Sequence, residues 1–181
     1  ALISLPSFST AEPAITPPPQ NPALSPEQLI KQTADRVVAK ILANRNALQQ
    51  NPQQLNALVE QDILPHSDLA LMSQQVLGPH WRQATPEQQA AFITQFQQLL
   101  IRTYSVALLH FADQTIDYLP APPHNDPSLA IVRTRLGNHG KRPIPIDYLL
   151  HLHEDAQWRV VDVKIDGISL VANYRSTFNG A

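Results

Sequence analysis

The spacing of the apolar residues changes once along this 181-residue chain, and that change constrains the fold more than any other feature. From Ser25 to about residue 111, apolar residues recur every three or four positions, which is typical of amphipathic helices. After Ala112 they alternate with polar residues, which is typical of strands with one covered face. Helices followed by hairpin-connected strands predict an α+β fold, in which helices cover an antiparallel sheet.

Three short segments mark where helices begin. Ser25-Pro26-Glu27-Gln28 and Thr85-Pro86-Glu87-Gln88 each have a hydroxyl at the N-cap, proline at the first helical position and a glutamine that completes a capping box. Asn51-Pro52-Gln53-Gln54 repeats this chemistry with an asparagine. We predict helices over about 25–48, 52–62, 67–83 and 86–111, the third of them broken at Gly78-Pro79.

The predicted helix over residues 86–111 is apolar over an unusually wide arc. Such a helix is buried on more than one side or lines an apolar space. Four of its residues, spaced four apart, are expected to form a stripe that faces the sheet: Phe96, Leu100, Tyr104 and Leu108. Strands are predicted over 115–119, 129–135, 144–152 and 158–165, and helical spacing returns over 168–178.

Composition excludes several classes of protein. The 13 basic and 15 acidic residues nearly balance, so no concentrated basic face for nucleic acid is expected. The chain has no cysteine, which excludes disulfides, cysteine-ligated zinc and a cysteine nucleophile. No apolar stretch reaches the roughly 18 residues of a membrane span.

The first 24 residues are expected to stand outside the folded domain. Seven of the 17 prolines fall within residues 1–26, and Thr16 to Pro22 is typical of an extended linker that is not needed for folding. Residues 1–11 resemble the end of a signal peptide, with small residues at Ser9 and Ala11, although a small apolar tail explains them too. We therefore expect a single domain over 25–181, helical to residue 111, with the sheet and the start of a C-terminal helix from 112.

The last part of the chain carries a long motif. Residues 158–178 read WRVVDVKIDGISLVANYRSTF, which resembles the signature of the MlaC/toluene-tolerance family, a W-x-V-x-D-V strand followed by G-[IV]-S-L-V-x-N-Y-R-S-x-F. Upstream, Leu64-Pro65-His66 and the segment LGPHWRQATPEQ at 77–88 also resemble the family, as do the aromatic and leucine positions of 92–104. The resemblance covers roughly Ser25 to Phe178.

Two features depart from the family pattern. Members usually continue with a further helical tail, whereas this chain ends at Asn179-Gly180-Ala181, so it is either trimmed or short. Any contribution of that tail to closing a cavity is therefore in doubt. The Pro-rich N-terminal segment is not a family feature either.

The resemblance implies a sheet related to the nuclear-transport-factor-2-like fold, a helical layer, and between them an apolar cavity that holds phospholipid acyl chains. It implies a periplasmic phospholipid carrier, the substrate-binding component of an ABC-type lipid transport system. Its partners would be an inner-membrane transporter complex and an outer-membrane lipoprotein–porin complex. We expect no enzymatic activity, no cofactor apart from bound phospholipid, no nucleic-acid partner and a monomer.

A carrier needs a dry apolar space, since each buried methylene contributes roughly 0.8 kcal/mol. Apolar and aromatic residues of the predicted helices and strands are candidates for its walls, although each could equally be ordinary core. The candidates are Val38, Ile41, Met72, Val76, Phe92, Phe96, Leu100, Tyr104, Leu108, Val132, Tyr148, Leu150, Val161, Val163, Val171 and Tyr174.

Other functions have weaker support in the sequence. A small-molecule enzyme on the same fold could use a pocket acid or tyrosine, and a protein-interaction module would have a filled core and an exposed apolar patch. No G-x-S-x-G motif is present. The residues behind these alternatives are Asp117, Tyr118, Asp147 and Tyr148 for an enzyme, His151 and His153 with Glu154 or Asp155 for a metal, and Arg133, Arg135, Lys141 and Arg142 for an anionic lipid head or a solvated hairpin.

Overall fold

Helices and strands follow one another in the predicted order, which confirms the α+β fold. The structure, a computed structural model, describes residues 24–123 and 125–180, so the predicted signal-peptide remnant and Pro-rich linker lie outside it except at Leu24. The helices are α1 (Pro26–Gln50), α2 (Pro52–Asp62), α3 (Leu69–Leu77), α4 (Pro86–Phe111) and α5 (Leu170–Asn179), with 3-10 turns η1 (Leu64–His66) and η2 (Gly78–Arg82). The strands are β1 (Ile116–Leu119), β2 (Leu129–Leu136), β3 (Ile144–Leu152), β4 (Trp158–Ile165) and β5 (Ile168–Ser169).

The helix starts bear out most of the capping chemistry. Ser25 and Thr85 form complete capping boxes at α1 and α4. The box predicted at Asn51 is wrong: its side chain accepts from the amide of Gln53 instead, at 3.1 Å, and no reciprocal bond forms. A short asparagine side chain reaches the amide two residues on, as in an Asx turn.

The third predicted helix is shorter than its apolar spacing indicated. It begins only after Asp68, whose carboxylate accepts from the amide of Leu71 at 2.8 Å and caps α3. It ends at Gly78, as predicted, because that residue has φ of +54°, which a residue with a side chain rarely adopts. Residues 64–66 and 78–82 form 3-10 turns instead.

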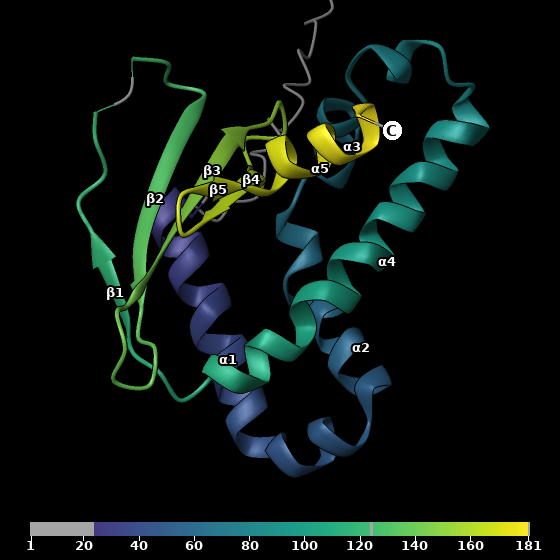
Figure 1. Cartoon of the computed structure of the whole chain (residues 1–181). Helices are drawn as coiled ribbons and strands as arrows, with labels where there is room; N and C mark the ends of the chain where they lie inside the picture. The colour runs from purple at the N-terminus through teal and green to yellow at the C-terminus, as the bar shows by residue number, and fades with distance from the viewer. Residues whose placement is uncertain (1–23, 124, 181) are drawn as a thin grey trace, which may run out of the picture.

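The sheet is antiparallel throughout, in the order β1-β2-β3-β4-β5 (Figure 1). Val132 lies opposite Tyr148, and Tyr148 lies opposite Val163, so these three side chains share one face. The register shifts where Leu149 pairs with Asp162 and Leu150 with Val160. Val161 is thus the extra residue of a β-bulge in β4.

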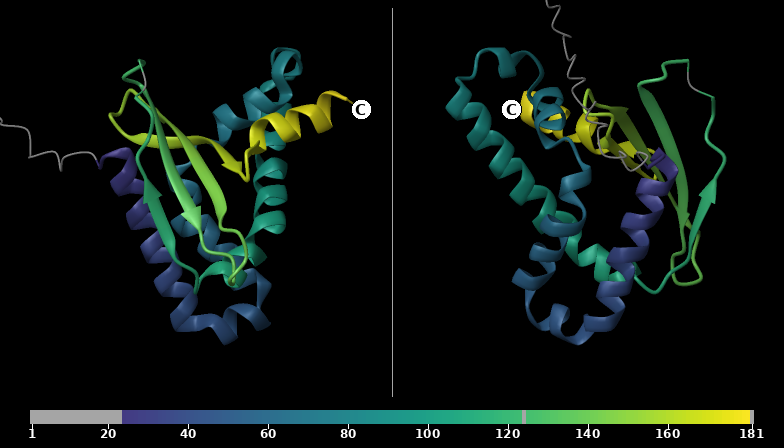
Figure 2. Two further views of the ribbon diagram at one scale, coloured as in Figure 1. Left: turned by 60° about the vertical axis from the view of Figure 1, so that its left-hand side comes forward. Right: turned by 180° about the vertical axis from the view of Figure 1, so that it is seen from behind.

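Helices meet the sheet at several places and also pack on one another. The start of α1 covers one face of the sheet near β2, while η1, α3 and α5 contact β4 (Figure 2). Ser67 forms a short parallel bridge with Val160, and the amide of Asp68 donates to the Val160 carbonyl at 2.9 Å. Helix α4 packs against α1, α2 and α3. No helix among residues 24–123 and 125–180 is long and apolar enough to cross a membrane.

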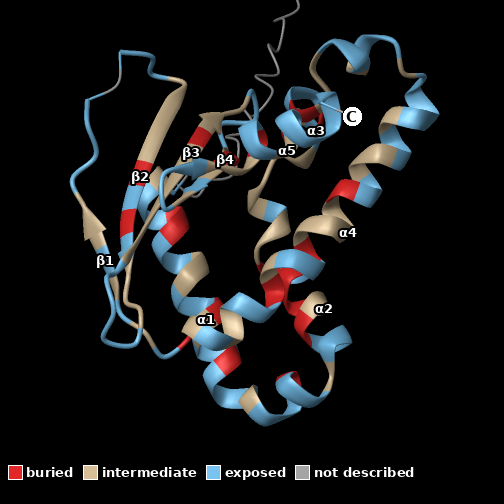
Figure 3. Cartoon of the chain, in the orientation of Figure 1, coloured by how far each residue is buried: buried red, intermediate tan, exposed pale blue. Residues whose placement is uncertain are grey.

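Buried apolar side chains gather in three separate clusters rather than one core (Figure 3). The base cluster joins α1, α2 and the residue after α4, and consists of Val37, Ile41, Leu48, Leu55, Leu58 and Ala112. The sheet cluster joins α1 to β2, β3 and β4, and consists of Leu29, Ile30, Val132, Leu150 and Val160. The α5 cluster joins α3, α4 and α5, and consists of Met72, Val76, Phe96 and Val171.

The clusters correct the expectation that one stripe of α4 faces the sheet. Phe96 belongs to the α5 cluster, and Leu108 packs against the base cluster. Two groups of helices therefore bury the two ends of the stripe. The wide apolar arc of α4 is explained by its having neighbours on more than one side.

Candidate functional site

The predicted wall residues are distributed over all three clusters. The α5 cluster gathers the most of them: Met72, Val76, Phe96 and Val171, with Phe92, Leu100 and Tyr174 packed against it. The sheet cluster holds Val132 and Leu150, with Tyr148 and Val163 against it. The base cluster holds Ile41, with Leu108 against it. The structure therefore does not gather the candidates into one packed group.

Burial divides the candidates into two sets. A side chain packed on every side loses its accessible area, whereas one that faces an open space keeps part of it. The buried set is Ile41, Met72, Val76, Phe96, Val132, Leu150, Val161 and Val171. The partly exposed set is Val38, Phe92, Leu100, Tyr104, Leu108, Tyr148, Val163 and Tyr174. The second set suits a cavity wall better, and the role of either set in lipid binding stays a prediction.

Tyrosine hydroxyls lie among these apolar side chains. The Tyr104 hydroxyl is hydrogen-bonded to Tyr174, and burial, together with Tyr174, raises the pKa of Tyr104 to about 12. Burial likewise raises the pKa of Tyr148, which is hydrogen-bonded to Thr134, to about 12. Burial also raises the pKa of Tyr118, whose buried hydroxyl has no hydrogen-bond partner among the described side chains. These phenols are neutral near pH 7 and can orient a polar ligand group, but they are poorly matched to proton transfer.

Helix α5 is held in place by a carboxylate from the sheet. Asp162 accepts hydrogen bonds from the amides of Val163 at 2.8 Å and Val171 at 3.1 Å, and from the hydroxyl of Ser169 at 2.5 Å. Ser169 in turn caps α5 by accepting from the amide of Ala172. The Asp and Ser of the C-terminal motif therefore fix the direction in which α5 leaves the sheet.

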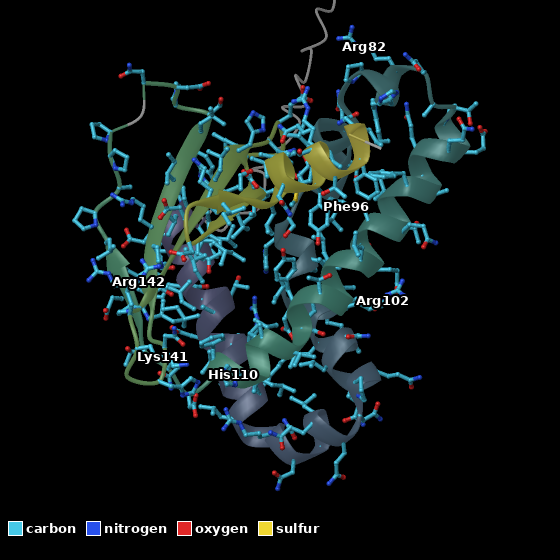
Figure 4. All side chains as sticks on the ribbon, viewed as in Figure 1. Arg82, Phe96, Arg102, His110, Lys141 and Arg142 are labelled. Atoms are coloured by element: carbon cyan, nitrogen blue, oxygen red, sulfur yellow. The ribbon has the colours of Figure 1, made fainter. Side chains whose placement is uncertain are left out.

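Aromatic rings hold the other side of α5 against α4. The ring of Phe96 (Figure 4) lies edge-on to Tyr174 at 5.4 Å between centroids, and Phe92 lies edge-on to Phe178 at 5.5 Å. Edge-to-face pairs of this kind contribute about 0.5–1.5 kcal/mol beyond their buried area. The motif residues Tyr174 and Phe178 thus join α5 to α4, beside Leu100 and Tyr104.

Two pockets lie away from the predicted wall residues. One, of about 450 Å³, is lined by Arg45, Leu48, Gln49, Pro52, Leu55, Ser105, Val106, Leu109, His110, Asp113 and His139. The other, of about 380 Å³, is lined by Lys40, Asn44, Leu48, Gln54, Ala57, Leu58, Gln61 and Asp62. Sequence reasoning missed both, because neither lining follows a motif and that of the first joins segments far apart in the chain.

Several of the residues behind the alternative functions have partners of their own. His151 and His153 have ring centroids 5.3 Å apart, but His153 Nε2 lies 3.1 Å from a carboxylate oxygen of Asp68. In the part of the chain that the structure describes, no group of three or more histidine, aspartate or glutamate side chains is arranged to hold a metal ion. Arg133 pairs with Asp147 at 3.6 Å, and Arg142 pairs with Asp166 at 2.7 Å.

Comparison with known proteins settles the family. The MlaC protein family matches residues 31–181, which is most of the chain and includes every helix and strand after the first turn of α1. The chain belongs to the MlaC family. The resemblance first indicated by the motif at 158–178 is confirmed.

Relatives of known function and structure agree with this assignment. A binding protein of the intermembrane phospholipid transport system from Haemophilus influenzae is 27% identical over 149 residues, which is 81% of this chain and 70% of the relative. A toluene tolerance protein from Pseudomonas putida is 26% identical over 160 residues, 88% of this chain and 74% of the relative. A phospholipid-binding protein from Ralstonia solanacearum, solved in complex with a phospholipid, has a TM-score of 0.80 and 33% identity, with 87% of each chain covered.

Proposed function

We propose that this chain is a periplasmic phospholipid carrier of an intermembrane lipid transport system. The likeness to the Ralstonia solanacearum protein carries the proposal, since that structure contains a phospholipid and shares both fold and a third of its residues with this chain. The Haemophilus influenzae relative is named for the same transport process.

The partly exposed wall residues supply the place for acyl chains. Leu100 and Tyr104 lie in the middle of α4, between the part held by α5 and the part held by the base cluster. Val163 and Tyr148 lie opposite each other on the sheet face that α1 covers only in part. We infer that acyl chains lie between these two surfaces, with the tyrosine hydroxyls near the ester groups.

A carrier requires no catalytic group, and the described residues fit that role. Tyr118 and Tyr148, the tyrosines considered for an enzyme, have pKa values raised by burial, so both stay protonated near pH 7 and are weak proton donors there. The carboxylate of Asp147 is paired with Arg133. We infer that the chain binds and releases lipid without changing it, exchanging it with an inner-membrane ABC transporter and an outer-membrane complex.

Mass spectrometry of organic extracts from the purified protein tests the proposal. We expect about one phospholipid or more for each folded molecule. The matched control is protein stripped of lipid in denaturant, refolded, and then incubated with phospholipid vesicles. Folded protein that carries no phospholipid and takes none from vesicles would contradict the carrier function.

A further inference from the structure

We propose that the larger pocket is a docking site for a protein partner that presents an apolar side chain next to an acidic one. We call it the base pocket; it lies between the end of α1, the start of α2, the end of α4 and the β2–β3 turn. The proposal rests on the proposed function, because a carrier must be recognised by the complexes that load and unload it.

The floor of the base pocket is apolar. Leu48 and Leu55 are buried members of the base cluster, and Leu109 packs against that cluster. At the rim, Val106 leaves 65% of its surface exposed. The volume of about 450 Å³ lies within the range of about 300–1,000 Å³ that is usual for binding pockets. A large apolar side chain would enter it and cover Val106.

Among the residues that the structure describes, the unpaired charge beside the rim is positive. His110 and His139 line it, and Lys141, two residues beyond His139, lies at the same end of the molecule (Figure 4). Lys141 has no ion pair among residues 24–123 and 125–180. The one carboxylate of the lining, Asp113, is 3.5 Å from Arg45 and largely neutralised by it. An acidic residue beside the apolar anchor complements this rim.

The rim is already held in shape. The ring of His139 places Nε2 3.0 Å from the carbonyl of His110, and its backbone amide donates to the side chain of Gln114 at 2.8 Å. Arg45 donates to the carbonyl of Leu109 at 3.0 Å and so ties α1 to α4. A preformed rim loses little conformational entropy when a partner binds.

The side of α4 on which the base pocket opens indicates that its ligand is a protein and not the carried lipid. Successive residues of a helix turn by about 100°, so Val106 and Tyr104 point about 160° apart. None of the predicted wall residues lines the base pocket. It therefore opens on a different side of α4 from the surface proposed to hold acyl chains.

Replacement of Val106 by glutamate tests the proposal, because it removes the apolar rim and repels an acidic partner. The lipid-loaded protein is measured by biolayer interferometry against the inner-membrane lipid transporter of the same bacterium in nanodiscs and against its purified outer-membrane complex. We expect Val106→Glu to weaken binding to at least one complex by about tenfold or more, with phospholipid content unchanged. Lys141→Glu should weaken binding less than Val106→Glu does. Its effect should be larger at low salt than at high salt.

Two variants serve as matched controls. Ile168→Glu places the same charge at an apolar residue that is 61% exposed on β5, away from the pocket, and should bind as wild type. Val106→Leu keeps the apolar rim and should also bind as wild type. Wild-type affinity of Val106→Glu for both complexes would overturn the docking site, as would wild-type protein that binds neither.

The same preparations separate this proposal from the carrier function. If Val106→Glu loses phospholipid while still binding both complexes, the base pocket belongs to the lipid site and the docking proposal is wrong. If wild-type protein binds a complex but carries no lipid, the carrier function fails and the docking site stands.

Discussion

The base cluster and the middle of α4 are built from the same kinds of residue but are packed differently. In the base cluster, leucines of α1 and α2 are almost wholly buried, with Leu55 only 2% exposed. In the middle of α4, Leu100 and Tyr104 keep part of their surface although they lie between two packed clusters. The comparison teaches that residue type determines where apolar side chains gather. Whether those side chains are fully buried depends on the helices and strands that pack around them.

Charged groups reinforce the base. Asp62 is buried at the end of α2, and its carboxylate lies 2.7 Å from Lys40 Nζ and 3.2 Å from Arg36 Nε, both on α1. Each cation is only about half buried, so solvent screens the pairs, and their main effect is to leave no unpaired charge at Asp62. Ion pairs thus help to fix α1 to α2, whereas the middle of α4 is held by apolar contacts and by the hydrogen bond between Tyr104 and Tyr174.

The largest difference is expected on truncating one leucine in each region. Leu55→Ala should lower the free energy of unfolding by about 2–5 kcal/mol, because Leu55 is only 2% exposed and its side chain packs on the other members of the base cluster. Leu100→Ala should cost clearly less, since Leu100 is only partly buried. Urea denaturation of lipid-free protein measures both. Equal losses would show that the middle of α4 is packed as tightly as the base.

Enlarging a side chain should affect stability in the base cluster but lipid binding in the middle of α4. Val37→Trp in the base cluster should cost about 1–3 kcal/mol through overpacking, because Val37 is 4% exposed and lines neither pocket. Leu100→Trp should cost little stability but fill space for acyl chain, and so lower the phospholipid bound per protein. Unfolding midpoints of lipid-free protein and lipid extraction measure the two effects. If Leu100→Trp destabilises the fold and the folded fraction binds lipid normally, Leu100 belongs to the core.

The smallest predicted effect is the dependence of stability on pH that comes from His66, beside the base cluster. Burial, and then Arg36, lower the pKa of His66 below its ordinary value of 6.5, although Asp62 acts in the opposite sense. Nε2 of His66 lies 3.2 Å from a guanidinium nitrogen of Arg36 and can only accept from it, which requires the neutral ring. The unfolded chain therefore takes up the proton first, and stability falls as pH drops through about 6.5 toward the folded pKa.

Urea denaturation at about pH 7.5 and about pH 5.5 measures this slope. His66→Gln should flatten it, because the titrating group is gone. Arg36→Ala should flatten it in part, since it removes one cause of the lowered pKa. A steeper fall in His66→Gln than in wild type would contradict the assignment.

Local chemistry explains why so much of the fold could be predicted. Helix α4 begins and ends where Thr85-Pro86 and the change of period at Ala112 place it, and β3 and β4 match their predicted ranges. These boundaries depend on residues close together in sequence. The start of α3 was placed two residues too early. The N-cap is Asp68, which the apolar spacing does not reveal, and its backbone amide also donates to Val160 of β4.

The candidate site was harder to predict from the sequence, because its contacts join residues that are far apart in the chain. Period alone placed Phe96, Leu100 and Leu108 on one stripe, but their neighbours come from α3, α5, α1 and α2. The base pocket was missed entirely, because Arg45, Val106 and His139 meet only after α1, α4 and the β2–β3 turn have come together.

The bridge between Ser67 and Val160 has a consequence for how the chain folds. It joins a residue before α3 to a strand near the C-terminus, so it closes a loop that contains α3, α4 and three strands. Closing so long a loop costs chain entropy before any contact repays it, and contacts of this kind slow folding. During synthesis the helices emerge first, and the apolar faces that form the sheet cluster and the α5 cluster stay uncovered until the strands and α5 have been made. Native assembly of these two clusters therefore waits for β4 and α5, and until then the uncovered apolar surface favours aggregation.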